Sequence, residues 1–211
     1  MDLESLRREY LHGGLSREDL ADDPHDQFSL WMQQALDLKI HDPTAMTIAT
    51  VSEDGQPSQR IVLLKHFDKD GFVFYTNYSS RKSKELGGNP KISLHFPWND
   101  IDRQVKICGE ANKISAAESL KYFVTRPKES KIAALASKQS DVLSSRSFLL
   151  NQFESLKQKF KDGEVPLPDY WGGYRVVAQE IEFWQGGANR LHDRFRYLRS
   201  VDSWQIDRLA P

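Results

Sequence analysis

The sequence predicts an α+β protein, in which antiparallel strands form a small closed or split β-barrel with helices at its periphery. Two observations favour this class. Runs of β-branched and aromatic residues follow one another along the chain, separated by short turns rich in Asp, Gly and Ser. Helical patterns interrupt these runs only in places, so the regular alternation of a doubly wound nucleotide fold is missing. No repeat or linker divides the 211 residues, so we expect one barrel domain over residues 23–211.

The N-terminal part is expected to hold an arm, a helix and two strands. Residues 1–22 are polar and weakly periodic, which is typical of an N-terminal arm. Asp23 and Pro24 predict a helix start, because Asp caps free N–H groups and Pro fits the first turn. Apolar residues at helical spacing then predict a core-facing side, made by Phe28, Trp31, Ala35 and Leu38. Strands are predicted at Ala45–Val51 and Ser58–His66.

Residues 60–82 predict a β-hairpin followed by a helix start. The strand-forming runs Ile61–Leu64 and Phe72–Tyr75 flank the turn sequence Asp68-Lys69-Asp70-Gly71. Ser79-Ser80 predicts the N-cap of a short helix at Arg81–Leu86. Hydroxyls, a helix start and adjacent cations favour an anion site, although a hairpin with solvated charges gives the same pattern.

Arg60 and Lys65 bracket the first strand of this hairpin. They are five positions apart, so a regular strand points them to opposite faces. A bulge, or two separate targets, is therefore needed if both bind ligands.

The rest of the chain is predicted to contain five more strands and three more helices. The strands are expected at Lys91–Phe96, Gln104–Ile114, Tyr174–Trp184, Phe195–Ser200 and Trp204–Leu209. The helices are expected at Ser115–Phe123, where Ser115 and Glu118 form a capping box, at Ser130–Ser137, and around Leu149, Phe153, Leu156 and Phe160.

The bulk composition argues against several classes of protein. The formal net charge of −1 gives no overall attraction to nucleic acid or to an anionic membrane. No apolar run approaches the roughly 20 residues of a membrane helix, and the acidic start does not resemble a signal peptide. The single cysteine, Cys108, excludes an internal disulfide and fits a reducing compartment. We therefore expect a cytoplasmic protein.

The candidate functional residues are cations accompanied by hydroxyls and amides. No dinucleotide fingerprint or P-loop is present, and the six histidines lie too far apart to predict a metal site. Residues 121–130 carry Lys, Tyr, Arg and Ser near a predicted helix end. Arg190, His192 and Arg194 share one face if their segment is extended. Such groups suit phosphate recognition, while solvated helix ends and a polar turn are the simpler interpretations.

Several stretches of the sequence together resemble the pyridoxine/pyridoxamine 5'-phosphate oxidase family. They run from one end of the chain to the other and include Arg60–Lys65, Phe74–Asn77, Ser80–Lys82, Arg7-Arg8-Glu9-Tyr10, Asp42–Met46, Phe96-Pro97-Trp98, Arg103-Gln104-Val105, Ser137–Ser140, Val165–Pro168, Trp171-Gly172-Gly173, Phe183–Gly187 and Arg190–Phe195. The resemblance implies an FMN-binding split barrel that forms a homodimer with FMN at the interface. It also makes the N-terminal arm a possible lid over the active site.

The resemblance implies two sets of binding residues. FMN would be bound by Arg60, Ile61, Val62, Leu63, Leu64, Lys65, Tyr75, Thr76, Arg81, Lys82, Gln104, Gln139, Ser140, Trp184 and Arg194. The substrate would be bound by Arg7, Arg8, Glu9, Tyr10, Lys65, Tyr122, Arg126, Ser130, Arg190, Leu191 and His192, with Arg190 and His192 also catalytic.

The implied reaction oxidises pyridoxamine or pyridoxine 5'-phosphate to pyridoxal 5'-phosphate, with O2 as acceptor and H2O2 as product. No side chain accepts two electrons, so the reaction needs a cofactor such as FMN. Two other functions stay open at this point. One is a flavin- or pyridoxal-phosphate-binding split barrel without turnover, and the other is a nucleic-acid-binding β-barrel, which the net charge disfavours.

Overall fold

The computed structural model describes residue 10 and residues 14–211 of the chain. Within these residues the strands are β1 (Ala45–Val51), β2 (Pro57–Leu63), β3 (His66–Asp68), β4 (Gly71–Asn77), β5 (Lys91–Trp98), β6 (Arg103–Lys113), β7 (Trp171–Gln185), β8 (Asp193–Arg199) and β9 (Trp204–Leu209). The α-helices are α1 (Pro24–Asp37), α2 (Arg81–Gly88), α3 (Ala116–Thr125), α4 (Lys128–Ala136) and α5 (Arg146–Lys159). The predicted helices and strands are therefore present, most with ends shifted by a few residues.

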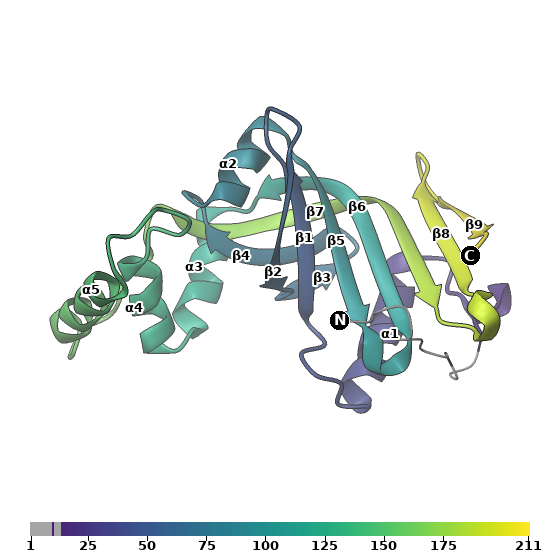
Figure 1. Cartoon of the computed structure of the whole chain (residues 1–211), viewed down its shortest axis with the longest axis horizontal. Coiled ribbons are helices and arrows are strands. Elements are labelled where there is room, and N and C mark those ends of the chain that lie inside the picture. The colour runs from purple at the N-terminus through teal and green to yellow at the C-terminus, as the bar shows by residue number, and fades with distance from the viewer. Residues whose placement is uncertain (1–9, 11–13) are drawn as a thin grey trace, which may run out of the picture.

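The strands form one curled antiparallel sheet, the split barrel that the sequence predicts (Figure 1). Its order is β2-β1-β5-β6-β7-β4-β3, and β8 and β9 extend it from the far end of β7. The long strand β7 pairs with β4 through its first half and with β8 through its second half. The register of β6 against β7 shifts between Cys108 and Gly109. A Cβ on Gly109 would lie 2.1 Å from the carbonyl oxygen of Val177, so only glycine allows this approach.

The main core lies between helix α1 and the sheet. Asp23 accepts a hydrogen bond from the N–H of His25, which confirms the predicted helix start. Phe28 is fully buried and makes edge-to-face contacts with Phe67, Phe72 and Phe96. The predicted amphipathic pattern is thus confirmed, except that Leu38, just beyond the helix, is 63% exposed.

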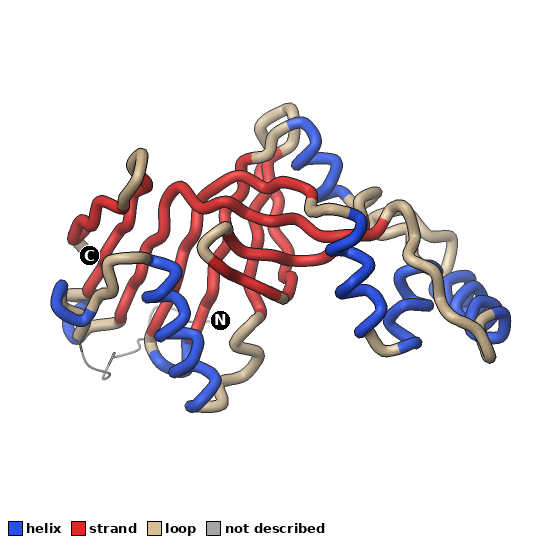
Figure 2. The backbone as a smooth tube through the Cα atoms, turned by 180° about the vertical axis from the view of Figure 1, so that it is seen from behind, coloured by secondary structure: helices blue, strands red, loops and turns tan. Residues whose placement is uncertain are grey.

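Helices α3, α4 and α5 pack around a second, smaller apolar cluster beside β7. Its buried members are Phe123, Ile132, Val165 and Trp171. The predicted capping box of Ser115 and Glu118 is present at the start of α3. These helices lie at one end of the molecule, and β8 and β9 lie at the other (Figures 1 and 2).

The predicted hairpin is only partly correct. The turn lies where the Asp/Gly sequence indicates, and Gly71 adopts a φ of +133° that other residues rarely tolerate. However, β4 pairs with the short strand β3, whereas Ile61 lies in β2 and pairs with Thr47 of β1. The chain leaves the β1–β2 ladder at Leu64 and Lys65, where the N–H of Lys65 donates to the carbonyl of Val73. Lys65 therefore lies outside the strand that holds Arg60, so the alternation of a regular strand does not apply between these two residues.

Candidate functional site

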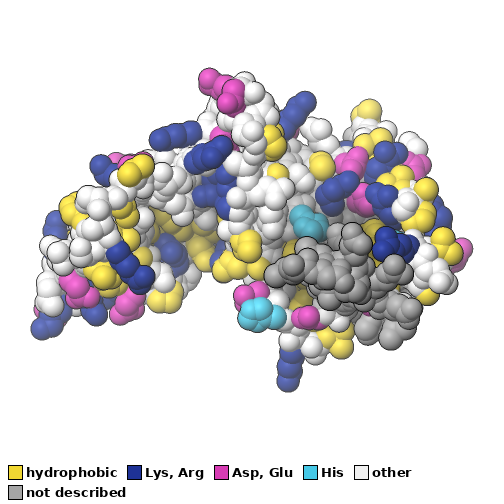
Figure 3. All heavy atoms as spheres, viewed as in Figure 1, with side chains coloured by type: hydrophobic (Ala, Val, Ile, Leu, Met, Phe, Trp, Pro, Cys, Tyr) yellow, Lys and Arg dark blue, Asp and Glu magenta, His cyan; other side chains and the backbone are white. Residues whose placement is uncertain are grey.

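A cleft of about 760 Å³ opens between the sheet and helices α2, α3 and α4. Lys and Arg side chains gather in this hollow (Figure 3). The cleft brings together many residues that the sequence resemblance assigns to FMN or substrate: Arg60, Ile61, Val62, Leu63, Lys65, Tyr75, Thr76, Arg81, Lys82, Tyr122, Arg126, Ser130, Gln139 and Ser140. Residues more than 60 positions apart in the chain therefore face one cavity.

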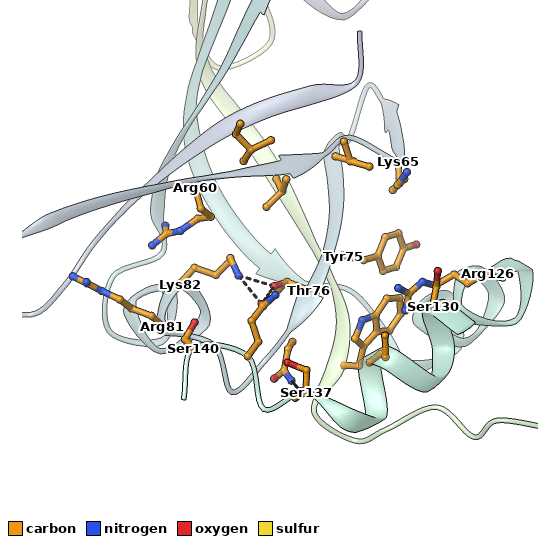
Figure 4. A pocket seen from close by; sticks show the side chains of 18 of the residues that line it. Arg60, Lys65, Tyr75, Thr76, Arg81, Lys82, Arg126, Ser130, Ser137 and Ser140 are labelled. Carbon is orange, nitrogen blue, oxygen red and sulfur yellow. Dashed lines mark hydrogen bonds between the residues drawn. The ribbon is translucent and has the colours of Figure 1, made fainter. Parts of the chain in front are cut away.

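One end of the cleft is built around Lys82, near the start of α2. The residue is 5% exposed, and its ammonium donates to Gln139 at 2.8 Å and to Thr76 at 3.0 Å (Figure 4). It also donates to Ser80 at 3.3 Å. Ser80 is the N-cap, as predicted, but its hydroxyl does not cap the backbone. Among the described residues no carboxylate pairs with Lys82 at ion-pair distance, so this buried cation has only neutral partners.

Burial, followed by the charge of Arg60, lowers the pKa of Lys82 to about 8, although the charge of Glu85 opposes this shift. The same end of the cleft contains the guanidinium groups of Arg60 and Arg81 (Figure 4). An anion of two charges placed here would meet three cationic side chains and the start of a helix. This end is therefore suited to a phosphate group.

The other end of the cleft combines aromatic rings with a second cation. Tyr75, Tyr122 and Trp171 form a cluster of nearly parallel rings, in which the Tyr75 centroid lies 4.0 Å from that of Tyr122 and 5.3 Å from that of Trp171. The guanidinium of Arg126 lies 4.8 Å from the Trp171 ring, and its buried Nη1 has no hydrogen-bond partner among the described residues. Ser130 lies nearby (Figure 4). A buried donor without a partner fits an anionic ligand at this end.

A second group of predicted residues lies outside this cleft, on β6, β7 and β8. Trp184, Gln104 and Arg194 line a smaller pocket of about 310 Å³, which shares no residue with the cleft. Arg194 donates from Nε to Oε1 of Glu182 at 2.8 Å, and its Nη2 forms an ion pair with the same oxygen at 2.8 Å. Burial would raise the pKa of Glu182, but hydrogen bonds from Lys106 and Arg194 lower it below its ordinary value.

The two predicted catalytic residues, Arg190 and His192, lie in the turn between β7 and β8. The expectation that Arg190, His192 and Arg194 form one extended segment is wrong. Arg190 ends a short 3-10 turn, and Asn189 and Arg190 both have positive φ angles, of 56° and 62°. Alternation along a strand therefore does not apply between Arg190 and His192. Arg190 and Leu191 are exposed.

His192 is held in this turn by a backbone hydrogen bond and by two rings. Its Nδ1 accepts from the N–H of Gly187 at 3.1 Å. The imidazole lies 4.6 Å from the Trp184 ring and 5.1 Å from the ring of Tyr10. Tyr10, the described residue of the predicted N-terminal motif, thus contacts two other predicted site residues, while Arg7, Arg8 and Glu9 fall outside the described residues.

One residue that the sequence assigned to the site has its side chain in the core. Several residues that line the cleft were not assigned to the site. Leu64 is 4% exposed and belongs to the main core. Trp171 lines the cleft, and the motif containing it was noted without a role for its ring. Ser58, Asn77 and Ser137 also line the cleft. Asn77 and Ser137 lie in stretches that carry the family resemblance but were given no role, and Ser58 has no distinctive sequence signal.

The described part of the chain contains neither a metal-binding cluster nor a membrane-spanning helix. No cluster of three or more His, Cys, Asp or Glu residues there is arranged to hold a metal ion. None of the helices within residues 14–211 is long and apolar enough to cross a membrane. What the cleft offers is cationic and aromatic contacts, which suit a phosphorylated aromatic ligand.

Comparison with known proteins identifies a family for the whole described fold. Residues 32–160 match the family model of pyridoxamine 5'-phosphate oxidase, and residues 171–211 match that of the pyridoxine 5'-phosphate oxidase C-terminal dimerisation region. Pyridoxine/pyridoxamine 5'-phosphate oxidases from Teredinibacter turnerae and Photobacterium profundum are 64% and 63% identical to this chain, each over 100% of both chains.

Solved structures agree with this assignment. PhzG from Burkholderia lata, in complex with tetrahydrophenazine-1-carboxylic acid, is 29% identical with a TM-score of 0.90, over 95% of this chain and 99% of that one. A pyridoxamine 5'-phosphate oxidase-related, FMN-binding protein from Nostoc punctiforme is 12% identical with a TM-score of 0.73, over 91% of this chain and 100% of that one, and shows the shared fold. The chain therefore belongs to the pyridoxine/pyridoxamine 5'-phosphate oxidase family.

Proposed function

We propose that this chain oxidises pyridoxamine 5'-phosphate or pyridoxine 5'-phosphate to pyridoxal 5'-phosphate, with FMN as cofactor, O2 as electron acceptor and H2O2 as product. The alcohol substrate loses two hydrogens, and the amine substrate also consumes one water and releases ammonia. The observation that carries this proposal is a single cleft with a phosphate-suited site at each end and aromatic rings beside one of them. The lone cysteine supports a reducing compartment such as the cytoplasm.

FMN fits the Lys82 end of the cleft. A buried ammonium with only neutral partners gains a strong counter-charge when a phosphate binds beside it. In this proposal the phosphate is held by Arg60, Arg81 and Lys82. Neutral contacts would come from Thr76, Gln139 and Ser140, and the strand residues 61–65 would lie along the cofactor.

The substrate fits the Arg126 end. Here the phosphate of the substrate would meet the buried Nη1 of Arg126 and the hydroxyl of Ser130, and Lys65 and Tyr122 line the same end. The stacked rings of Tyr75 and Tyr122 form an apolar wall beside these polar groups. A phosphate gripped at the remote end of a small substrate fixes its orientation at the reacting carbon.

We propose that the active site is completed across a homodimer interface. Trp184, Arg194, Arg190 and His192 do not line the cleft of their own chain. They belong to β7, β8 and the turn between them, within the segment that matches a dimerisation region. In a two-fold dimer the turn of one protomer would reach the cleft of its partner. Tyr10, packed on His192 and Trp184, would bring the N-terminal arm to the same place as a lid.

Bound FMN would supply the two-electron acceptor for oxidation at the substrate carbon that bears the amine or alcohol. The chain's own residues would bind and orient the substrate and polarise its reacting group. Arg126 and Ser130 would hold the substrate phosphate, and Arg190 would supply a permanent positive charge near the reacting group. His192 accepts a hydrogen bond at Nδ1, so its Nε2 carries the ring proton when the imidazole is neutral. That N–H is the group available to a substrate oxygen or nitrogen.

The test is to mix purified protein with pyridoxamine 5'-phosphate without oxygen and follow the flavin absorbance. An oxidase loses the oxidised flavin spectrum, then regains it on admission of air with release of H2O2 and pyridoxal 5'-phosphate. A binding protein without turnover keeps the oxidised spectrum throughout. That second result would contradict the proposed activity.

A further inference from the structure

A single buried carboxylate, that of Glu85 in α2, lies behind the cations at the Lys82 end of the cleft. Its side chain is 5% exposed, and Glu85 is not among the residues that line the cleft. Arg81 donates to Oε1 through Nε at 2.7 Å, and Arg60 lies 3.4 Å from Oε2 through Nη2. Two guanidinium groups that face the cleft are therefore anchored on one carboxylate.

Hydroxyl groups complete the coordination of Glu85. Ser58 donates to Oε2 at 2.7 Å, and Thr50 donates to the same oxygen. Both hydroxyls also accept from Arg60, which donates to Thr50 through Nη1 and to Ser58 through Nη2. The network thus ties Arg60 to its anchor directly and through two bridges, from strands β1 and β2 to helix α2.

Glu85 stays ionised at any working pH. Burial would raise its pKa, but hydrogen bonds from Thr50, Ser58 and Arg81, with the charge of Arg60, lower it to about 2. A permanent anion one layer behind a phosphate site has two opposing effects. The first is repulsion of the phosphate, which is weakened because the cleft is open to solvent and charges there are screened. The second is orientation of the two guanidinium groups that would bind the phosphate directly.

We propose that Glu85 is a positioning residue, which aims Arg60 and Arg81 at the phosphate of FMN. This inference rests on the proposed function, because it takes the Lys82 end of the cleft as the site of the FMN phosphate. Preorganisation outweighs repulsion here, because an arginine that is already oriented loses little side-chain entropy when the phosphate binds.

The experiment compares binding of FMN and of riboflavin, the same ring system without a phosphate, to full-length apoprotein. Glu85→Gln removes the charge and one of the two acceptor oxygens. Glu85→Asp keeps the charge but shortens the side chain, so that it no longer reaches both arginines. Both variants should weaken FMN binding by about tenfold and leave the riboflavin Kd unchanged. Glu154→Gln on the exposed face of α5 is the matched control and should change neither.

The outcomes separate the inference from the proposed function. If wild-type protein binds riboflavin as tightly as FMN, the assignment of the phosphate site itself is wrong. If that site holds but Glu85→Gln binds FMN equally well or more tightly, repulsion dominates and the positioning role is overturned. Equal weakening of both flavins would make Glu85 a structural residue. Should the Glu85 variants fail to fold, Thr50→Val, which removes the bridge that does not line the cleft, must weaken FMN but not riboflavin binding.

Discussion

The ammonium nitrogen of Lys82 lies 2.8 Å from Oε1 of Gln139, a residue 57 positions further along the chain. This contact joins the start of α2 to the loop that follows α4, and so closes one end of the cleft. Gln139 is exposed, whereas Lys82 is buried. The pair therefore sets a cation at the bottom of a site whose outer edge is formed by a loop.

Affinity for FMN should fall as the pH rises above about 8. Lys82 has a pKa of about 8 in the free protein, so it carries its charge below that pH and loses it above. A bound phosphate favours the charged form and raises this pKa, so binding takes up a proton at higher pH. Linkage then lowers the affinity by up to about tenfold per pH unit. Fluorescence titration with FMN between pH 7 and 9.5 measures the effect.

The matched variant is Lys82→Met, which has no charge to lose. It should bind FMN weakly at every pH in this range, without the decline of the wild type. A Lys82→Met protein that kept the same decline would assign the titration to another group.

The two ends of the cleft should respond differently to loss of an arginine. Arg81→Ala should weaken FMN binding at least about tenfold, because it removes a charge-assisted contact to the cofactor phosphate. Arg126→Ala should keep its FMN and raise the KM for pyridoxamine 5'-phosphate by a similar factor. Arg146→Ala on the exposed surface of α5 is the control. Loss of FMN from Arg126→Ala but not from Arg81→Ala would reverse the assignment of the two ends.

Activity should be restored when two damaged subunits form one dimer. Arg126→Ala damages the cleft, and Arg190→Met damages the turn between β7 and β8. In a hybrid dimer one site receives both substitutions and the other receives neither, if each site takes its turn from the partner. Co-expression in equal amounts should yield about a quarter of wild-type activity at low substrate, since half of the dimers are hybrids with one native site of two.

The control for this experiment is a mixture of the two variants purified separately and kept from exchanging subunits. It should show only their residual activities. Hybrid dimers without any gain in activity would mean that each site is built within one chain.

The sequence was informative about elements and less so about their partners. Apolar periodicity and capping residues located α1 and α3 closely, because these signals are local. The run Ile61–Leu64 was paired with the wrong strand, because several apolar strands compete for it and the choice depends on the curl of the whole sheet. The break at Lys65, which frees that residue from the ladder, has no local signature.

The turn after β7 shows the same limit at the site. The sequence predicts a polar extended segment from Arg190 to Arg194, but Asn189 and Arg190 adopt left-handed backbone angles. Asparagine tolerates this conformation, and arginine adopts it less readily. The resemblance identified residues of the cleft and residues of the smaller pocket as parts of one site. Neither the motifs nor their spacing in the sequence could predict that these two groups lie apart within one chain.

Arg190→Met should reduce kcat/KM by roughly 100-fold or more, and His192→Asn should reduce it far less. Arginine is charged throughout the working pH range, so its loss removes a fixed electrostatic contribution at the reacting group. Asparagine at position 192 offers an oxygen near the position of Nδ1, which preserves acceptance from the N–H of Gly187 and hence the shape of the turn. FMN content should stay unchanged in both variants. Stopped-flow measurement of flavin reduction without oxygen isolates the hydride transfer from reoxidation.

Because Arg190 is exposed and has a φ of 62°, a purely conformational role is the competing explanation. Arg190→Gly, which relaxes the backbone but removes the charge, separates the two: it should be as impaired as Arg190→Met, and near-normal flavin reduction in either would remove Arg190 from catalysis.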